Sequence, residues 1–161
     1  MGWGLVPPTT YTVALDGGTL RRGFWLYVWE VVTPGGATLL YVGRTGGRSS
    51  VNAQSPFNRM GQHLGTTKTS SMLRNHLDGR GVAPEECSFR LVARGPILAE
   101  ADDRDIHYER RDVIGALEKK LAESLVAAGY DVMNTVHCNR PLDEALYDEI
   151  HEAFAAEFPA L

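Results

Sequence analysis

The clearest pattern along the chain is an aromatic and β-branched run over residues 24–32, followed by a similar run over residues 38–44. Such side chains are enriched in β-strands. The sequence TPGGA at residues 33–37 between the two runs is typical of a turn. The two runs are therefore predicted to form an antiparallel hairpin. Residues 87–93 alternate between apolar and polar and are predicted to form a third strand.

Helical patterns follow the hairpin. Ser55 is a suitable capping residue, and the next residue, Pro56, suits the first position of a short helix. The apolar residues on one side of this helix are Phe57, Met60 and Leu64. A second short helix is predicted to begin among residues 69–71 and to end at residues 78–79.

A long amphipathic helix is predicted over residues 106–128, ended by Gly129, and a last, acidic helix over residues 142–158. The apolar residues at helical spacing in the long helix are Ile106, Val113, Ile114, Leu117, Leu121 and Leu125. Together these elements predict an α/β (α+β) fold, in which a small central antiparallel β-sheet of about three strands is flanked by helices.

The length of 161 residues suits one domain. Residues 1–22, which contain a double proline and an Asp-Gly-Gly turn, are expected to form an extended N-terminal arm with room for one strand. Residues 23–136 form the expected core, and residues 137–161 a C-terminal helical extension of the same domain.

Composition narrows the class of protein. A hydrophobic content of 43% with 22% charged residues is ordinary for a globular chain. The longest apolar run, residues 24–29, is far below the roughly 20 residues of a membrane helix, and no secretory signal is recognised. We therefore expect a cytoplasmic protein without a membrane span. Cys87 and Cys138 match no metal or redox spacing and are expected to be reduced, buried thiols.

Charge is unevenly distributed although the net charge is only −4. Residues 40–80 contain six basic residues against the single acid Asp78, so this window carries +5 and the rest of the chain −9. The basic residues of this window are Arg44, Arg48, Arg59, Lys68, Arg74 and Arg80. Such segregation favours an anionic partner near the window, and phosphate is the obvious one.

Two tyrosines, Tyr27 and Tyr41, occupy the middle of the two hairpin strands. A strand tyrosine usually serves packing, so neither one indicates a site by itself. A phenol near a metal-bound water can act as a general base once its pKa is lowered. Either tyrosine could take this role.

Arg59 and His63 lie four residues apart in the first short helix, on a side away from its apolar residues. The planar guanidinium of Arg59 matches phosphate oxygens and would stabilise developing negative charge. His63 could position a water molecule, receive a proton or hydrogen-bond a phosphate. Since both side chains are expected outside the packed face, neither is predicted to be needed for folding.

Glu118 lies at the edge of the apolar stripe of the long helix, whereas Glu123 points nearly opposite the stripe and is predicted to be solvated. A carboxylate at such a boundary can be held rigidly and still reach a metal ion. Mg²⁺ favours one or two carboxylates together with waters and substrate phosphate. Pairing with a nearby basic residue is the ordinary alternative for Glu118.

In their order along the chain these residues resemble the GIY-YIG nuclease family. The motifs are LYV at residues 26–28 and YVG at residues 41–43, followed by an arginine and histidine, a glutamate, and Asn134. The resemblance covers residues 24–135. It implies one metal-dependent phosphodiesterase site built from the two tyrosines, the arginine, the glutamate and the asparagine. The first motif departs from the family pattern, although Gly23 lies just upstream, and the segment between Gly43 and Arg59 is long.

The resemblance implies a metal-dependent endonuclease that hydrolyses phosphodiester bonds, with DNA as the expected substrate. One ion, Mg²⁺ or Mn²⁺, would be held by Glu118, a tyrosine would activate water and Arg59 would clamp the phosphate. His63 is included among the catalytic candidates. The predicted substrate-binding residues are Arg44, Lys68, Arg74 and Asn134. The resemblance also implies that Asn134 supports the site by hydrogen bonding. A homodimer or a partner protein could supply specificity.

The alternative is a non-catalytic module that keeps this fold and serves nucleic-acid binding or assembly. The net negative charge and the lack of a separate DNA-recognition domain favour it. The retention of polar groups at all the candidate positions favours the enzyme. Other catalytic patterns, such as a zinc-protease motif, a phosphate-binding P-loop or a nucleophile elbow, are not found in the sequence.

Overall fold

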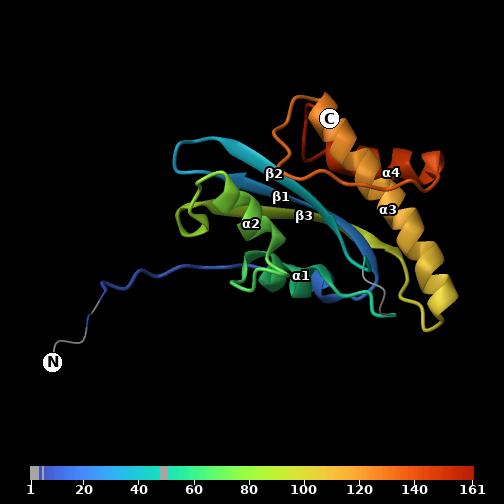
Figure 1. Cartoon of the computed structure of the whole chain (residues 1–161), viewed down its shortest axis with the longest axis horizontal. Helices are drawn as coiled ribbons and strands as arrows, with labels where there is room; N and C mark the ends of the chain where they lie inside the picture. Colours follow the sequence, from blue (N-terminus) through green and yellow to red (C-terminus); the bar gives the residue numbers. More distant parts are fainter. Residues whose placement is uncertain (1–3, 5, 48–50) are drawn as a thin grey trace.

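A three-stranded antiparallel sheet lies at the centre of the computed structural model, which describes residues 4, 6–47 and 51–161 (Figure 1). Strand β1 (Phe24–Val32) is the middle strand, with β2 (Thr38–Arg44) on one side and β3 (Ser88–Leu98) on the other. The predicted hairpin strands are confirmed at both ends. The third strand is longer than predicted, because it continues through Gly95 and Pro96, residues that usually end a strand.

Helices cover both faces of this sheet, which confirms the predicted α+β fold (Figure 1). The helical elements are η1 (Gly17–Leu20), α1 (Pro56–Leu64), α2 (Met72–Gly79), η2 (Pro84–Glu86), α3 (Arg104–Ala127) and α4 (Glu144–Ala155). Helices α1 and α2 pack on one face, and α3 and α4 on the other. Ser55 caps α1 as predicted, by accepting a hydrogen bond from the Asn58 backbone N–H. Gly129 follows α3 with a φ of 95°, a left-handed conformation that favours glycine and ends the helix.

The period of two along each strand sorts side chains between these faces. Even-numbered residues of β1 and β2 enter a cluster with α3 and α4, which we call the apolar core. Its largest members are Phe24, Leu26, Leu40, Ile114, Leu117, Leu121, Leu125, Tyr147, Ile150, Phe154 and Phe158. Odd-numbered residues enter a second cluster with α1 and α2, which we call the aromatic cluster. Its buried members are Tyr27, Trp29, Val31, Leu39, Tyr41, Leu73 and Leu77.

The two edges of the sheet differ. The outer edge of β2 is covered by residues 131–134, because Leu40 donates to the Asp131 carbonyl and accepts from Met133 N–H, both at 2.8 Å. The outer edge of β3 is paired with no strand in the described part of the chain. The apolar side chains of β3 are correspondingly only half-buried on both faces of the sheet.

Three expectations about burial need correction. Phe57, expected on the apolar side of α1, is 44% exposed, and His63, expected away from that side, is buried with 1% exposure. Met60 and Leu64 pack against the aromatic cluster as expected. A nine-residue helix has too few turns for its periodicity to define the buried side completely. Cys87 and Cys138 are free thiols as expected, but they are only partly buried.

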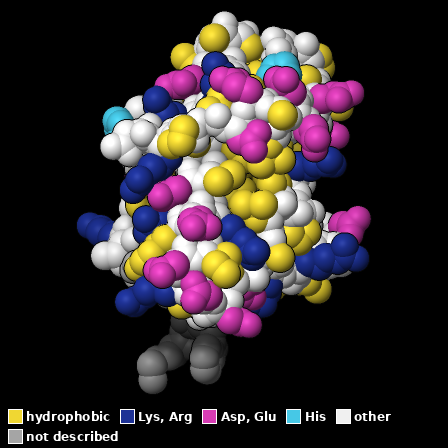
Figure 2. Space-filling view, turned by 90° about the vertical axis from the view of Figure 1, so that its right-hand side faces the viewer, with side chains coloured by type: hydrophobic (Ala, Val, Ile, Leu, Met, Phe, Trp, Pro, Cys, Tyr) yellow, Lys and Arg dark blue, Asp and Glu magenta, His cyan; other side chains and the backbone are white. Residues whose placement is uncertain are grey.

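The N-terminal arm is extended and exposed over residues 6–16, and it contains no strand in its described part. It leaves the rest of the molecule beside α1 (Figure 1). On the face formed by α3 and α4, acidic and basic side chains are interspersed around a stretch of hydrophobic ones (Figure 2). Within the described residues, none of the helices has the length and apolar content needed to cross a membrane.

Candidate active site

A pocket of about 380 Å³ lies where β2 ends, between α1 on one face of the sheet and α3 on the other. All five predicted catalytic residues line it: Tyr27, Tyr41, Arg59, His63 and Glu118. They come from β1, β2, α1 and α3, and they are separated by up to 91 positions in the sequence. The fold therefore brings together residues that the sequence only placed in order.

The tyrosines reach this pocket because both are odd-numbered residues of neighbouring strands. Tyr27 pairs with Gly43 across the hairpin, and its ring lies over that glycine. A side chain at position 43 would overlap the ring, with its Cβ 2.7 Å from the Tyr27 hydroxyl oxygen. The glycine of the YVG motif thus makes room for the first tyrosine. Burial raises the pKa of Tyr27 to about 12 and also raises the pKa of Tyr41.

His63 lies between the two tyrosine rings. Its Nε2 is 2.6 Å from the Tyr27 hydroxyl oxygen, and its ring centroid is 5.6 Å from that of Tyr27 and 5.1 Å from that of Tyr41. Burial, helped by the positive charge of Arg59, lowers the pKa of His63 to about 3, so the ring is neutral at pH 7. Its buried Nδ1 has no hydrogen-bond partner in the described part of the chain.

Arg59 supplies positive charge to the pocket. Its Nη1 donates to the side-chain oxygen of Gln62, and the Gln62 amide donates to the Gln54 side-chain oxygen at 3.2 Å. The Nε atom of Arg59 is buried without a hydrogen-bond partner, and no carboxylate pairs with this guanidinium in the described residues. A guanidinium that lines a pocket without a carboxylate partner is suited to bind an anion.

Glu118 faces the pocket from α3 and pairs with Arg44. The Arg44 Nε lies 3.1 Å from a Glu118 carboxylate oxygen, and the Arg44 Nη1 donates to the Arg111 carbonyl at 2.9 Å. Arg44 lies against α3 at Gly115, where any side chain would overlap the guanidinium. Burial raises the pKa of Glu118 to about 7, although the charges of Arg44 and Arg59 oppose this rise. The side chain of Glu118 is 12% exposed.

The carboxylate of Glu118 is suited to bind one hard divalent cation in the pocket. No group of three or more metal-ligating side chains is found in the described residues, so a cage made entirely of protein ligands is absent from this part of the chain. Mg²⁺ instead accepts one carboxylate, with waters and phosphate oxygens as its other ligands. A buried carboxyl group whose pKa is raised by desolvation gains from a cation beside it. Glu118 is the residue that would hold such an ion.

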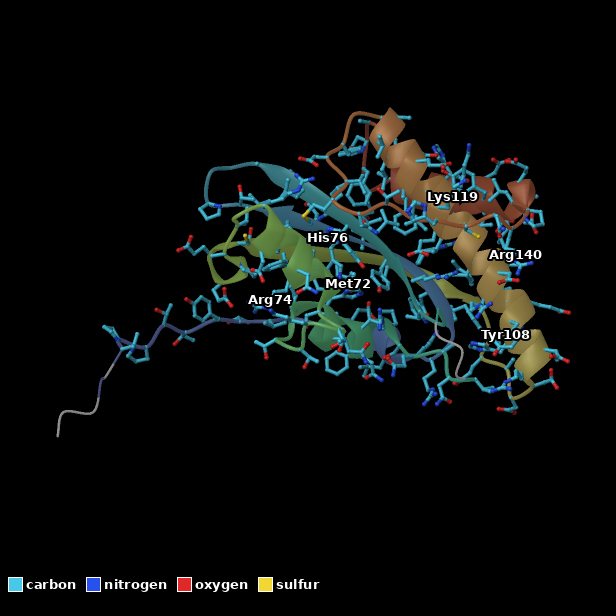
Figure 3. The ribbon with its side chains drawn as sticks, in the orientation of Figure 1. Met72, Arg74, His76, Tyr108, Lys119 and Arg140 are labelled. Atoms are coloured by element: carbon cyan, nitrogen blue, oxygen red, sulfur yellow. The ribbon has the colours of Figure 1, made fainter. Side chains whose placement is uncertain are left out.

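Three of the four predicted substrate-binding residues lie outside the pocket, and only Arg44 lines it. Lys68 is exposed beyond the end of α1. Arg74, on α2, donates twice to the Leu64 carbonyl at 3.1 Å and pairs with Glu85 at 2.7 Å, so its guanidinium is engaged within the fold (Figure 3). The predicted substrate contact of Arg74 is therefore not supported by its position.

Asn134 makes supporting hydrogen bonds, as the resemblance implies, and it makes them to the backbone of β2. Its side-chain oxygen accepts from the Val42 N–H at 2.9 Å, and its side-chain nitrogen donates to the Val42 carbonyl at 2.8 Å. The amide thereby completes the covered edge of β2 with both of its polar atoms. It supports the strand that carries Tyr41 and is not available to bind substrate through these atoms.

The basic window is largely neutralised by the fold. Three of its residues pair with acids that lie outside the window: Arg44 with Glu118, Arg74 with Glu85 and Arg80 with Asp131. Arg48 lies outside the described residues. The charge of +5 therefore overstates the positive potential of this surface. Among the described residues that line the pocket, Arg59 is the one whose positive charge is not paired with a carboxylate.

Sequence reasoning missed several residues of this pocket. Asn52, Gln54, Gly46 and Gly47 line it, and they belong to the long segment between the YVG motif and α1. The length of that segment was the available signal. Its polar and glycine composition was typical of any surface loop and did not identify the side chains that face the pocket.

Comparison of the chain with models of protein families, with curated proteins and with solved structures finds no match in any of the three.

Proposed function

We propose that the protein is a metal-dependent nuclease that hydrolyses phosphodiester bonds in DNA. The observation that carries this proposal is the convergence of two tyrosines, an arginine, a histidine and a glutamate on one pocket. The two tyrosines, the arginine and the glutamate belong to the set that the resemblance to GIY-YIG nucleases implies for one site, and Asn134 of that set supports β2 beside the pocket. Packing gathers apolar side chains, as in the apolar core, and does not account for an arginine, a histidine and a glutamate at one pocket.

Arg59 is the proposed phosphate-binding residue. Its positive charge has no carboxylate partner among the described residues, and its contact with Gln62 holds one end of the guanidinium in place. A phosphate in the pocket would receive the remaining N–H groups. Because negative charge increases on the phosphoryl oxygens during hydrolysis, a fixed guanidinium stabilises the transition state more than the ground state.

Tyr27 and His63 form the proposed base. Tyr27 alone cannot accept a proton at pH 7, because a pKa of about 12 keeps its phenol protonated. Neutral His63 at 2.6 Å, with its own proton on Nδ1, accepts the phenol hydrogen bond. It would hold the phenol proton once the negative charge of a bound phosphate opposes the burial and the Arg59 charge that lower the pKa of the ring to about 3. The phenol oxygen then accepts a proton from the attacking water. Of the two tyrosines, Tyr27 is the better candidate because it has this hydrogen bond.

Glu118 would hold the divalent cation, which supplies Lewis acidity at the phosphate and stabilises the leaving oxygen. The chain's own contribution is to keep this carboxylate fixed between α3 and the pocket. In the structure the Glu118 carboxylate pairs with Arg44, so it would have to bind Arg44 and the ion at the same time.

The second candidate, a non-catalytic nucleic-acid-binding module, draws support from the same ion pair. If the Arg44–Glu118 pair is permanent, the carboxylate is satisfied without a metal. The pocket would then bind a phosphate at Arg59 without cleaving it.

A plasmid-nicking assay in Mg²⁺, Mn²⁺ or EDTA tests the proposal. We expect cleavage by the natural chain that depends on the metal, a loss of about 100-fold or more in Arg59→Ala, and comparable loss in Glu118→Gln. Lys68→Ala is the matched control, since Lys68 belongs to the same basic window but is exposed outside the pocket. It should retain its activity.

Cleavage that survives in both pocket variants would contradict the proposal. Salt-sensitive DNA binding without turnover in either metal would favour the non-catalytic module.

A further inference from the structure

The N-terminal arm has the pattern of a β-strand but no strand partner. Tyr11, Val13 and Leu15 alternate with Thr10, Thr12 and Ala14. The three larger apolar side chains are 84%, 80% and 48% exposed, respectively. In residues 6–15 no backbone hydrogen bond to the rest of the described chain is found. Burial of these side chains against a partner would therefore stabilise a complex through the hydrophobic effect.

The base of the arm is fixed, in contrast to its outer part. Asp16 caps η1, the Trp25 indole N–H donates to the Arg21 carbonyl at 3.1 Å, and Arg22 pairs with Glu100. Figure 1 shows the arm leading away from the body beyond this anchor. The fold thus holds residues 9–15 away from the chain's own sheet, where a second molecule can reach them.

The outer edge of β3 presents the complementary feature. Residues 88–94 offer seven consecutive positions before Gly95 and Pro96, and in the described part of the chain no strand pairs with their outer edge. The apolar side chains along this edge are half-buried, and they lie on both faces of the sheet: Phe89, Leu91, Val92 and Ala93. An added strand would bury their exposed parts and pair the free backbone groups of β3.

We propose that residues 9–15 of one copy add as a fourth strand to the outer edge of β3 in a second copy. The two segments have the same length of seven residues, and the arm carries no charge between residues 6 and 15 that would oppose the approach. Reciprocal exchange uses both arms and both edges, which gives a closed two-fold dimer without a leftover edge. A second copy of the chain is therefore the partner that would pair the backbone of both the arm and the free edge of β3.

A proline scan of residues 10–14 tests the backbone pairing, with alanine at each position (glycine at Ala14) as the matched control. The oligomeric state is measured by sedimentation velocity over a range of concentrations. In an added strand, alternate N–H groups point toward the neighbour, and proline is tolerated where the N–H points away. We expect a dimer whose dissociation constant rises at least tenfold for proline relative to the control at every second position.

A monomer at all concentrations, or a dimer indifferent to the arm variants, would overturn the proposal. A dimer weakened equally by proline at every position would also overturn it, because that result indicates apolar contact without strand pairing.

Disulfide formation tests the location of the arm. Cys87 immediately precedes β3, and Cys138→Ser removes the other natural thiol. In that background, Thr9→Cys or Leu15→Cys places a thiol at one end of the arm segment. We expect one of the two to form a disulfide-linked dimer that disappears in Cys87→Ser. A link within one chain, or a dimer that does not need Cys87, would place the arm elsewhere and overturn the proposal.

Discussion

The apolar core and the pocket share the same sheet and the same long helix, yet they differ in whether their buried polar atoms have hydrogen-bond partners. In the core, the Tyr147 hydroxyl donates to the Ser124 hydroxyl at 2.6 Å, and the large side chains around it are apolar. In the pocket, buried nitrogen atoms of His63 and Arg59 have no hydrogen-bond partner in the described part of the chain. An unpaired buried polar atom costs about 1–3 kcal/mol. The core contributes stability, and the pocket contains groups that reduce it.

Helix α3 shows this contrast within a single turn. Leu117 and Leu121 are fully buried in the apolar core, whereas Glu118 between them faces the pocket with a raised pKa. A buried carboxyl group that is costly to ionise would not be expected in a helix selected for stability alone. The largest pKa shifts among the described residues belong to groups that line this pocket, and such clustering is typical of functional sites.

The largest expected effects separate the two regions. Leu121→Ala should lower the free energy of unfolding by about 2–5 kcal/mol through loss of buried apolar contacts, with the cleavage rate per folded molecule unchanged. Arg59→Ala should change the free energy of unfolding by about 1 kcal/mol or less while reducing cleavage about 100-fold. Chemical denaturation and plasmid nicking measure the two quantities. Parallel losses of stability and activity in both variants would remove the distinction between core and pocket.

Gly43→Ala should affect both properties, because the added methyl group overlaps the Tyr27 ring. We expect a loss of about 1–3 kcal/mol in the free energy of unfolding, as for other overpacked sites. We also expect a lower cleavage rate, because the ring must move away from His63. Gly61→Ala in α1 is the control, since nothing lies within 4 Å of its added carbon. It should be neutral or stabilise α1 by up to about 1 kcal/mol.

Asn134→Ala should lower stability by a similar amount and have a smaller effect on cleavage. The variant leaves Val42 N–H and carbonyl groups without their partners, at an expected cost of about 1–3 kcal/mol. If the asparagine instead bound substrate, the variant would fold with unchanged stability and show a raised KM. Denaturation curves together with cleavage rates at several DNA concentrations distinguish the two roles.

Much of the fold could be predicted from local patterns. The strands at residues 24–32 and 38–44 have strong β-forming runs and a clear turn, and the structure confirms their bounds. The long helix was evident because six apolar residues repeat along it, although Ile106 at its start is 43% exposed. The full length of β3 was missed because Gly95 and Pro96 resemble an end signal.

The candidate site was harder to predict because its geometry depends on contacts between distant residues. The sequence indicated Tyr27, Arg59 and Glu118, but it could not show that Arg44 pairs with Glu118 or that His63 is buried between aromatic rings. Local charge counts were misleading for a related reason. The acids that neutralise the basic window lie beyond it in the sequence and meet it only after folding.

The most direct test of the difference between the apolar core and the pocket compares the natural chain with Glu118→Gln. The cleavage rate and the free energy of unfolding of both proteins are measured from pH 5 to pH 8. Between the ordinary carboxyl pKa of 4.5 and about 7, the native state holds one more proton at Glu118 than the unfolded state does. The free energy of unfolding of the natural chain therefore falls as the pH rises through this window, whereas glutamine has no proton to lose.

We expect Glu118→Gln to cleave at least about 100-fold more slowly and to gain up to about 3 kcal/mol of stability relative to the natural chain as the pH rises to 8. Because His63 is present in both proteins, its own titration cancels in the difference. The central claim is that the buried Glu118 carboxylate lowers stability and is needed for cleavage. A Glu118→Gln variant that cleaves as fast as the natural chain would contradict it. A stability difference between the two proteins that does not change with pH would also contradict it.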